Sequence, residues 1–387
     1  MTEGNQSAHE VLFSSRRNMP KEVIKPKEIY EYLRTLVIGQ DGPLRDIATA
    51  LYKHLINHKV GNVIMIGNSG TGKTTIMRTI EAFFVHHPEY GSFSTTVRIN
   101  ANLLADLSRG GTQSSVILEK LQLESLRILG RDATLDKMVE RIENGIVCID
   151  EVDKIRASMG GEPNVKGIIA QDSLLTLMEN DSILFSVQWM DNGELRQQIM
   201  PINTNNILFI AAGAFEELYE MVFTRVTGPK SKRPLKAMLV QREDGTLRRQ
   251  IIFRLGEHLL HEDMFRYGMV PQFISRFESI VILDDLNTDA LVTIFKDLPN
   301  SIYTLSQTYF ASVGVTLQVP ERIMRIIADR ASMNNRIGAR ALKETFYRII
   351  RNYEFDPFSS GLVKKTPQGN VLEITEDVVR RYLGEAA

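Results

Sequence analysis

Residues 61–77, GNVIMIGNSGTGKTTIM, decide the fold that this chain is expected to adopt. The apolar run NVIMI predicts a short buried strand, and residues 67–74 after it fit the pattern G-x-x-x-x-G-K-[ST]. Glycines in such a loop let backbone N–H groups turn inward around phosphate oxygens at the start of a helix. A strand that leads through a phosphate loop into a helix predicts a nucleotide-binding α/β domain.

The predicted phosphate-binding residues form one continuous run along this loop. They are Gly67, Asn68, Ser69, Gly70, Thr71, Gly72, Lys73, Thr74 and Thr75. Lys73 brings a positive charge to the terminal phosphates, and the Thr74 hydroxyl is a predicted Mg²⁺ ligand. The loop therefore predicts a nucleotide held together with Mg²⁺.

A second motif, GIVCIDEVDKI at residues 145–155, carries the acidic half of the site. Asp150 ends an apolar run, where a carboxylate is costly unless it meets a cation, here Mg²⁺ held through water. Glu151 follows the strand end and can polarise a water in line with the γ-phosphate. Asp153 and Lys154 are expected to be surface groups beside it. An Asp-Glu pair is a weak signal alone, but with the phosphate loop it predicts Mg²⁺-dependent hydrolysis.

The overall composition is that of a globular protein. With 387 residues, the chain is long enough for roughly two or three domains. Its formal net charge of -1 gives no overall attraction to nucleic acid or membrane. The single cysteine, Cys148, excludes an internal disulfide and a multi-cysteine zinc site. No run approaches the roughly 18 apolar residues of a membrane span, so we expect a cytoplasmic protein without a membrane partner.

The hydrophobic pattern changes along the chain. Strands are predicted at residues 61–67, 95–101, 145–150 and 205–213, and hairpins around Asp191-Asn192-Gly193 and Asp244-Gly245. After about residue 284 the pattern is mostly helical. We therefore predict three parts, which are a flexible N-terminal arm at 1–26, a large α/β domain at 27–283 and a small helical domain at 284–387.

Several motifs, in this order, carry a resemblance to a known family. They are VIGQ (37–40), the phosphate loop, GIVCIDEVDKI, NNILFIAAGAF (205–215), YGMVPQFISRF (267–277) and IGARALKETF (337–346). The chain resembles the AAA+ ATPases ClpX and HslU of the Clp family over about residues 26–385. The resemblance implies an α/β AAA+ module, in which a P-loop parallel sheet has helices on both faces and is followed by a smaller, mostly helical lid.

The resemblance also implies roles for residues outside the phosphate loop and the acidic motif. Val37 and Ile38 match the residues that line the adenine pocket of ATP. Arg276 matches the arginine finger that reaches the γ-phosphate of a neighbouring subunit, so the family pattern implies a ring, most simply a hexamer. Arg340 matches the sensor-2 arginine of the lid. AAGAF offers no polar side chain at the sensor-1 position, so no residue is assigned there.

Two expected partner sites of the family are missing. ClpX carries an N-terminal zinc-binding module built on cysteines, and residues 1–26 contain none. ClpX docks on the ClpP peptidase through an aliphatic-Gly-Phe tripeptide, which residues 225–250 lack, so ClpP is not an expected partner. This segment is basic instead, and its cations are Arg225, Lys230, Lys232, Arg233, Lys236, Arg242, Arg248 and Arg249. Residues 225–249 are either a solvated hairpin or a patch for an acidic partner or nucleic acid.

The loop that grips substrate in ClpX and HslU also differs here. Those proteins carry Gly-Tyr-Val-Gly, whereas this chain reads SRGGTQSS at 108–115, with Gly111 at the tyrosine position and Thr112 at the valine position. Arg109 is either solvated or contacts a phosphate backbone or acidic chain. A second loop, MGGEPNVKGII at 159–169, also lacks aromatic residues, although Lys166 adds a charge.

Two functions fit these observations. One is a ClpX-like ATPase that couples Mg-ATP hydrolysis in an oligomeric ring to remodelling of a protein partner, without a ClpP peptidase. The other is an ATP-driven assembly or nucleic-acid-associated switch that uses the ring as a scaffold. The complete set of nucleotide-sensing motifs favours the first, and the missing aromatic residue favours the second.

Overall fold

The structure of the chain is a computed structural model that describes residues 23–58, 61–105, 113–179, 182–228, 237–241, 247–251, 253–333, 338–359, 361–367 and 369–383. These residues form two compact units, each described by itself. The first unit takes the described residues within 1–30, 45–66 and 80–282, and the second takes those within 31–44, 67–79 and 283–387. Within these ranges no helix is long and apolar enough to cross a bilayer.

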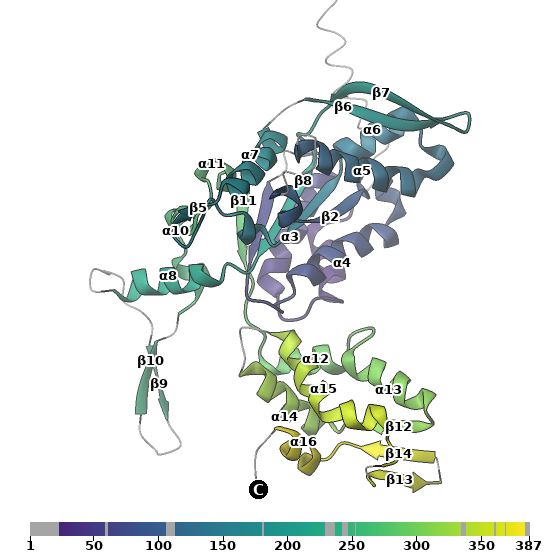
Figure 1. Cartoon of the computed structure of the whole chain (residues 1–387), viewed down its shortest axis with the longest axis vertical. Coiled ribbons are helices and arrows are strands. Elements are labelled where there is room, and N and C mark those ends of the chain that lie inside the picture. The colour runs from purple at the N-terminus through teal and green to yellow at the C-terminus, as the bar shows by residue number, and fades with distance from the viewer. Residues whose placement is uncertain are drawn as a thin grey trace, which may run out of the picture. The chain divides into compact units, whose positions relative to one another are not determined.

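A parallel sheet forms the centre of the first unit (Figure 1). Among the described residues it has five strands in the order β11-β1-β8-β3-β2, and each neighbouring pair is parallel. The strands are β1 (Asn62–Ile66), β2 (Thr96–Asn100), β3 (Ile146–Asp150), β8 (Leu208–Gly213) and β11 (Phe277–Ile282). This arrangement confirms the predicted α/β fold with a parallel sheet.

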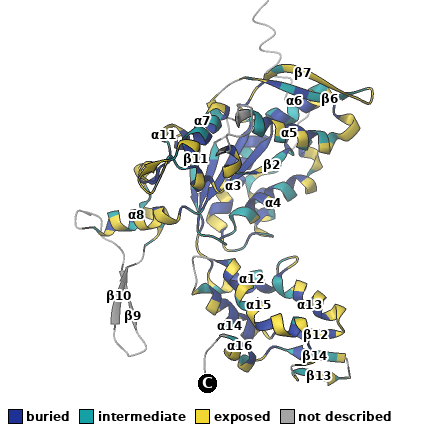
Figure 2. Ribbon diagram, viewed as in Figure 1, coloured by how far each residue is buried: buried dark blue, intermediate teal, exposed yellow. Residues whose placement is uncertain are grey.

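Both faces of this sheet are buried. Ile64 and Ile149 lie in one hydrophobic cluster together with residues of the helices on that side. Successive side chains of a strand point to opposite faces of the sheet. Their neighbours in sequence, Val63 and Cys148, point to the opposite face and are also fully buried. Figure 2 shows these central strands in dark blue. Burial on both faces explains why the strands read as continuous apolar runs.

Helices and short helical turns connect the strands of the first unit. The helices are α5 (Gln113–Leu129), α6 (Leu135–Glu143), α7 (Val165–Glu179), α8 (Glu216–Thr227), α9 (Leu255–His258), α10 (His261–Tyr267) and α11 (Pro271–Ile274). The 3-10 turns are η1 (Pro88–Phe93), η2 (Ala101–Ala105), η3 (Gly130–Asp132) and η4 (Val152–Ile155). Three more helices have residues in both units, which are α2 (Pro26–Arg34), α3 (Asp41–Leu55) and α4 (Lys73–His86).

Three hairpins extend the first unit. They are β4–β5 (Ser158–Met159 and Glu162–Pro163), β6–β7 (Ile183–Asp191 and Glu194–Ile202) and β9–β10 (Ala237–Gln241 and Leu247–Ile251). The β6–β7 turn confirms the hairpin predicted at Asn192-Gly193, because both residues have the positive φ, 52° and 87°, that such a tight turn needs. The predicted hairpin around Gly245 is also present in β9–β10, although its turn lies outside the described residues.

The second unit is mostly helical, as predicted for the C-terminal part of the chain. Its helices are α12 (Thr288–Lys296), α13 (Ile302–Ser312), α14 (Glu321–Ser332), α15 (Ala339–Phe355) and α16 (Glu376–Leu383). A small sheet, which the sequence pattern did not predict, joins β12 (Val315–Gln318), β13 (Val363–Thr366) and β14 (Gly369–Glu373). The predicted limits at 26 and 283 stay predictions, and most of the predicted arm, residues 1–22, lies outside the described residues.

Candidate nucleotide site

The phosphate loop follows β1 and belongs to the second unit. Gly70 and Gly72 have φ values of 78° and 107°, which residues with a side chain adopt only with strain. A Cβ atom at Gly67 would lie 2.8 Å from Leu283 Cβ and 2.9 Å from Thr71 Oγ1. The glycines of the motif therefore each meet a local requirement, and the loop is tightly built.

Lys73 begins helix α4 and folds back over the loop. Its Nζ donates hydrogen bonds to the carbonyl oxygens of Gly67, at 2.5 Å, and Asn68, at 2.8 Å. The ammonium group therefore lies across the loop at the N-terminal end of a 14-residue helix, where the backbone N–H groups and the helix dipole favour an anion. Thr74, the next residue, is half-buried in the first turn.

Gln40 ties the loop to the segment that leads into the lid, a role that the sequence reasoning missed. Its Nε2 donates to the carbonyl oxygens of Thr71, at 3.0 Å, and Asp284, at 2.8 Å, and its Oε1 accepts the Asp284 N–H. The side chain is 1% exposed, so these bonds satisfy a buried amide. Gln40 is the last residue of the VIGQ motif. Its partner Asp284 is 244 residues away, so motif spacing could not predict the contact.

The two predicted adenine-pocket residues lie at the other end of the same motif. Val37 is buried, and a Cβ atom on Gly72 would lie 3.9 Å from its Cγ1. Ile38 is partly buried against the hydrophobic core of the second unit. Val37 is therefore beside the phosphate loop, whereas the assignment of both residues to adenine stays a prediction.

The lid helix α15 begins against the phosphate loop within the second unit. Arg340 Nη1 donates to Ser69 Oγ at 2.9 Å, and the Ala339 N–H donates to the Gly70 carbonyl at 3.1 Å. Gly338, with φ 51° and ψ -133°, permits this approach, because a Cβ there would lie 2.7 Å from the Gly70 oxygen. The structure thus brings the predicted sensor-2 arginine to a predicted phosphate-loop residue.

The acidic motif lies at the carboxyl end of β3 in the first unit. Asp150 is the last residue of the strand, and Glu151 has the left-handed angles φ 58° and ψ 36°. Such angles are uncommon for a residue with a long side chain and are often found at functional sites. Asn100 and Asn102 hold the Glu151 carboxylate through amide hydrogen bonds of 2.9 and 3.3 Å. These two asparagines were not predicted, although Asn100 is paired with Asp150 across β2 and β3.

Asp153 is buried, so the expectation that it is a surface group is wrong. Its side chain is 3% exposed, its Oδ1 accepts the N–H of Ala214 at 3.2 Å, and Lys154 pairs with it at 3.5 Å. A Cβ atom at Gly213 would lie 2.6 Å from this oxygen. A buried carboxylate therefore fills the space beside the end of β8, and a side chain at Gly213, within the AAGAF motif, would clash with it.

The predicted arginine finger, Arg276, is exposed at the end of the α11 segment. Its guanidinium pairs with Glu179, the last residue of α7 in the same chain. Its carbonyl oxygen accepts from Asn62 Nδ2 at 3.0 Å, and Asn62 Oδ1 accepts the Phe209 N–H. The backbone of the finger is thus fixed to the sheet, while its exposed side chain has an acidic partner.

The predicted substrate-facing loops are only partly described. Residues 108–112, with Arg109, Gly111 and Thr112, lie outside the described residues. The second loop forms the β4–β5 hairpin, turns at Gly160-Gly161 with φ 60° and 87°, and leaves Lys166 exposed.

The side chains of the basic segment beyond residue 228 also lie outside the described residues. Arg225, which precedes these residues, is half-buried and forms a two-bond ion pair with Asp263. The charge of Arg225 is therefore neutralised inside the first unit, so this residue does not belong to the predicted basic patch.

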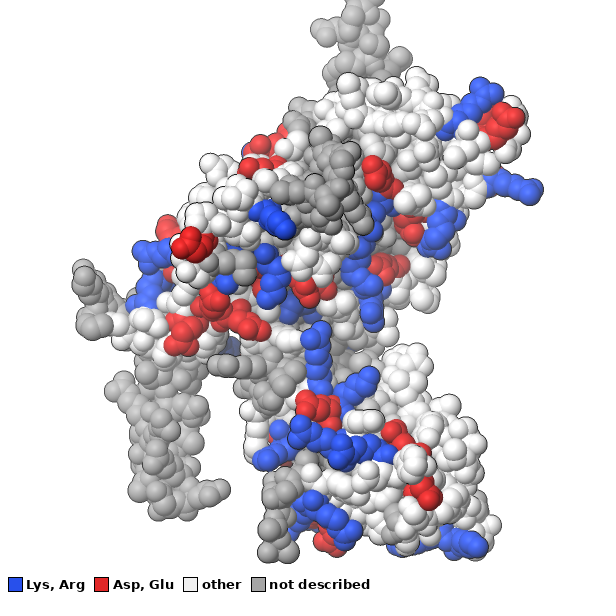
Figure 3. Space-filling model, viewed as in Figure 1, with Lys and Arg blue, Asp and Glu red and all other residues white. Residues whose placement is uncertain are grey.

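Charged side chains gather on the second unit over α14, α15 and α16 (Figure 3). Many of these cations have acidic partners, and the pairs are Arg322–Glu376, Arg325–Asp289, Arg348–Glu344 and Arg380–Glu376. Exposed pairs of this kind contribute little to stability, and each neutralises part of the positive charge of these helices.

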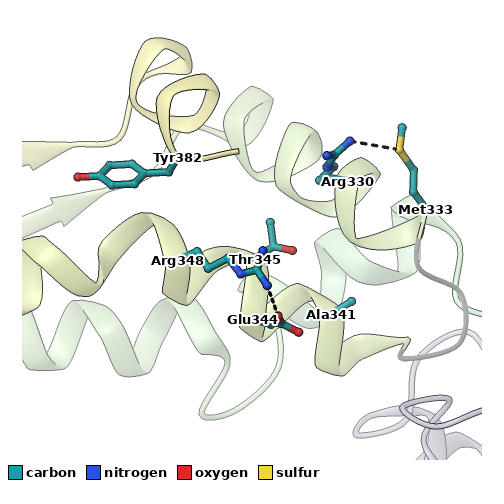
Figure 4. Close-up of a pocket in the computed structure, with 7 residues that line it drawn as sticks. All are labelled: Arg330, Met333, Ala341, Glu344, Thr345, Arg348 and Tyr382. Carbon is teal, nitrogen blue, oxygen red and sulfur yellow. Dashed lines mark hydrogen bonds and ion pairs between the residues drawn. The ribbon is translucent and has the colours of Figure 1, made fainter. Parts of the chain in front are cut away.

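A cavity of about 290 Å³ opens between the same helices (Figure 4). It is lined by Arg330, Met333, Ala341, Glu344, Thr345, Arg348 and Tyr382. Arg348 pairs with Glu344 along one wall, and Arg330 contacts the Met333 sulfur at 3.9 Å. None of the predicted nucleotide-site residues lines this cavity, so it is distinct from the phosphate loop.

The residues of the two motifs fit ATP and Mg²⁺ by their chemistry. The glycine cradle, Lys73 and the N-terminus of α4 suit phosphate oxygens, and the Thr74 hydroxyl and Asp150 carboxylate are the oxygen donors that Mg²⁺ prefers. In the described part of the chain, no cluster of three or more His, Cys, Asp or Glu side chains could cage a metal. Mg²⁺ needs no such cage when phosphates and water complete its shell.

A parallel sheet, a phosphate loop and an acidic strand end, with a helical unit bonded to the loop, define the class of P-loop ATPases. The chain matches the family described as AAA domain (Cdc48 subfamily) over residues 58–280. It is 30% identical to the ATP-dependent Clp protease ATP-binding subunit ClpX of Bacteroides fragilis, over 92% of this chain and 81% of that protein. ClpX of Azotobacter vinelandii is 28% identical over 95% of this chain and 85% of that protein.

This chain therefore belongs to the ClpX-like AAA+ ATPases, with the ATP hydrolysis and chaperone-like function of that family. The match to ClpX of Porphyromonas gingivalis, 28% identical over 87% of this chain and 79% of that protein, agrees with this assignment.

Proposed function

We propose that this ATPase forms a ring, most simply a hexamer, and uses ATP hydrolysis to remodel a protein partner without a ClpP-type peptidase. The observation that carries the proposal is the hydrogen bond from Arg340 to Ser69, at 2.9 Å. It joins the lid helix α15 to the loop expected to hold phosphate, so a change in the bound nucleotide has a direct route to the lid. Movement of a lid with the nucleotide state is what a remodelling motor requires.

The proposed roles in hydrolysis follow from the chemistry of each residue. Lys73 would bind the terminal phosphates, and Thr74 and Asp150 would hold Mg²⁺, which would supply positive charge to the phosphate oxygens. Glu151 accepts a proton from, or orients, the attacking water. Asn100 and Asn102 hold its carboxylate in one place, so the base does not have to be ordered during the reaction.

The ring is proposed because Arg276 matches the arginine finger of the family and is exposed on its own subunit. In the family pattern the arginine finger acts on the nucleotide of a neighbour, where its charge stabilises the transferring phosphoryl group. Arg276 is exposed and pairs with Glu179 within its own chain, so its proposed action requires that it leave this carboxylate for a γ-phosphate. A nucleotide site that needs a neighbour's arginine is active only in an assembly.

Independence from ClpP rests on the sequence of residues 225–250, which lack the aliphatic-Gly-Phe docking tripeptide. Pull-down of purified ClpP and measurement of the ATPase rate with and without it test this proposal. We expect no complex and no change in rate. A stable complex would show that another surface docks the peptidase.

A second function, an ATP-driven switch that uses the ring as a scaffold, is favoured by one observation, the absence of an aromatic residue at Gly111. The two functions differ in what stimulates hydrolysis. The test is the ATPase rate with an unfolded protein, with single-stranded DNA and with RNA, using Glu151→Gln as the inactive control. Stimulation by unfolded protein alone supports remodelling, whereas stimulation by nucleic acid alone overturns it.

A further inference from the structure

Gln171 is a fully buried polar side chain in the middle of α7, and it bridges two distant segments of the first unit. Its Nε2 donates to the carbonyl oxygen of Ile155 at 2.7 Å, and its Oε1 accepts the N–H of Val270 at 2.8 Å. The residue is 0% exposed. A buried amide left without partners is costly, so both bonds tie α7 firmly to these two backbone groups.

The two bonded segments carry the two halves of the proposed chemistry. Ile155 is the last residue of η4, which directly follows Glu151. Val270 is the N-cap residue of α11, and Arg276 follows two residues after the end of that helix. One side chain therefore connects the segment behind the water-activating carboxylate with the segment that presents the arginine finger.

The finger segment depends on such outside contacts for its position. With four residues, α11 is too short to be stable by itself, and Pro271 at its start has no N–H to donate. Gln171 fixes the N-terminal end of the segment through Val270, and Asn62 fixes its C-terminal end through the Arg276 carbonyl. Phe273 and Ile274 hold the middle of this segment in the core of the first unit. Removing the first contact therefore loosens the N-terminal end of a segment that must place a guanidinium accurately.

We propose that Gln171 is a positioning residue for the arginine finger, because its bond to Val270 sets where each subunit presents Arg276 to its neighbour. The inference rests on the proposed in-trans action of Arg276. Gln171 touches neither nucleotide nor substrate in this role. Its second bond, to Ile155, ties α7 to the end of the acidic motif of the same subunit.

Rings mixed from two inactive subunits test the inference. A finger donor carries Glu151→Gln, so that its own site is dead and its Arg276 is intact. A site donor carries Arg276→Ala, so that its own site is intact and its finger is dead. In mixed rings, the intact site of a site donor can lie beside the intact Arg276 of a finger donor. We expect ATP to be hydrolysed at these interfaces. A mixture that stays inactive although mixed rings form would show that Arg276 does not act in trans, which overturns the proposed function whatever Gln171 does.

Gln171→Met is then added to one subunit type at a time. Methionine has a similar volume and removes both hydrogen bonds. In the finger donor we expect it to slow the mixed rings by about ten- to a hundredfold, the order expected when a reacting group is misplaced. In the site donor we expect the rate to stay within about twofold. An equal loss in both positions, a loss only in the site donor, or no loss overturns the inference.

Two further variants separate positioning from general damage. Gln171→Glu in its neutral acid form can accept the Val270 N–H and donate to the Ile155 carbonyl oxygen, and under mildly acidic assay conditions it should restore most of the rate in the finger donor. Val270→Pro removes that N–H at a backbone angle, φ -66°, which proline adopts, and should reproduce the loss even if Gln171→Met folds poorly. Normal rates with Val270→Pro in the finger donor would overturn the inference.

Gln122 provides a matched control in the same unit. It is also buried, at 5% exposure, and its Oε1 accepts the N–H of Gln188 at 2.7 Å, in the β6–β7 hairpin. Gln122→Met therefore removes the same kind of bond without touching the finger segment. It should leave the mixed-ring rate unchanged in either subunit type. A loss as large as that from Gln171→Met would show that any buried glutamine of this unit matters equally.

Discussion

Arg340, in the first turn of the lid helix α15, donates a 2.9 Å hydrogen bond to the hydroxyl of Ser69 in the phosphate loop. The bond joins residues 271 positions apart in the chain and lies within one compact unit. Because the partner is a neutral hydroxyl, a phosphate oxygen beside it would bind the guanidinium more strongly. The contact is consistent with the proposal that Arg340 responds to a bound nucleotide.

Replacing Arg340 with alanine should lower the maximal ATPase rate about tenfold, or about 1.4 kcal/mol in the barrier. The guanidinium is lost, whereas the glycine cradle and Lys73 remain, so nucleotide should still bind. Steady-state ATPase rates and equilibrium binding of a fluorescent ATP analogue measure the two effects. Arg348→Ala, on the same helix but paired with Glu344, is the control and should leave the rate unchanged. Equal rates for both variants would remove Arg340 from the proposed role.

Gly338 should tolerate no side chain, because its Cβ would lie 2.7 Å from the Gly70 oxygen and its φ is 51°. Gly338→Ala must push the lid helix away from the phosphate loop, and we expect ATP affinity to fall at least about tenfold. Gly361→Ala is the matched control, since Gly361 also has a positive φ, 67°, but nothing within 4 Å of its Cβ position. It should cost about 1 kcal/mol of stability and leave ATP affinity intact.

The stability of the first unit should fall as the pH is lowered from about 6.5 to about 4. His54 is 1% exposed, its Nε2 lies 3.1 Å from the Asn144 carbonyl oxygen, and burial lowers its pKa from 6.5 to about 4. In that pH window the unfolded chain binds a proton that the folded chain excludes, so protonation favours unfolding by on the order of 3 kcal/mol.

Urea unfolding measured between pH 4 and pH 8 tests this prediction. The single tryptophan, Trp189, packs against the core of the first unit, so its fluorescence reports on that unit. His54→Gln removes the titrating group and should flatten the acid side of the profile. An acid limb that is the same in both proteins would assign the pH dependence to other groups.

Local sequence patterns predicted the parts of the fold that depend on neighbouring residues. The phosphate loop, the strand that precedes it and the Asn192-Gly193 turn each need particular residues at fixed spacing, and all three are present in the structure. The resemblance to a family added the distant residue Arg340, which the structure brings to Ser69.

The features that the sequence did not predict depend mostly on contacts between segments that are far apart in the chain. The edge strand β11 and the short strands of the lid sheet lack the continuous apolar runs that marked the buried strands. Asp153 was placed on the surface because its partner, the Ala214 N–H, is 61 residues away. The roles of Gln40 and Gln171 were not predicted for the same reason. Most glutamines lie on the surface, and only the structure shows that these two have buried partners.

The last prediction concerns the loop at 108–115, of which residues 108–112 lie outside the described residues. If this loop contacts a polypeptide, as in the resembling family, its grip depends on the contact area of its side chains. An aromatic ring offers a large apolar surface at a small cost in side-chain entropy, and Gly111 and Thr112 offer little. We therefore expect the natural protein to unfold stable domains poorly and to act on extended or loosely held partners.

The combined variant Gly111→Tyr and Thr112→Val should increase ATP-dependent unfolding of a stable fluorescent reporter, measured as loss of fluorescence while a trap captures unfolded molecules. Adding Glu151→Gln to the same variant should abolish the effect, which would show that the added grip works through hydrolysis and not through binding alone. Several unrelated tags on the reporter separate grip from tag recognition. Robust unfolding of every tagged reporter by the natural sequence would mean that SRGGTQSS holds a polypeptide without an aromatic side chain. The missing aromatic residue would then not limit this motor.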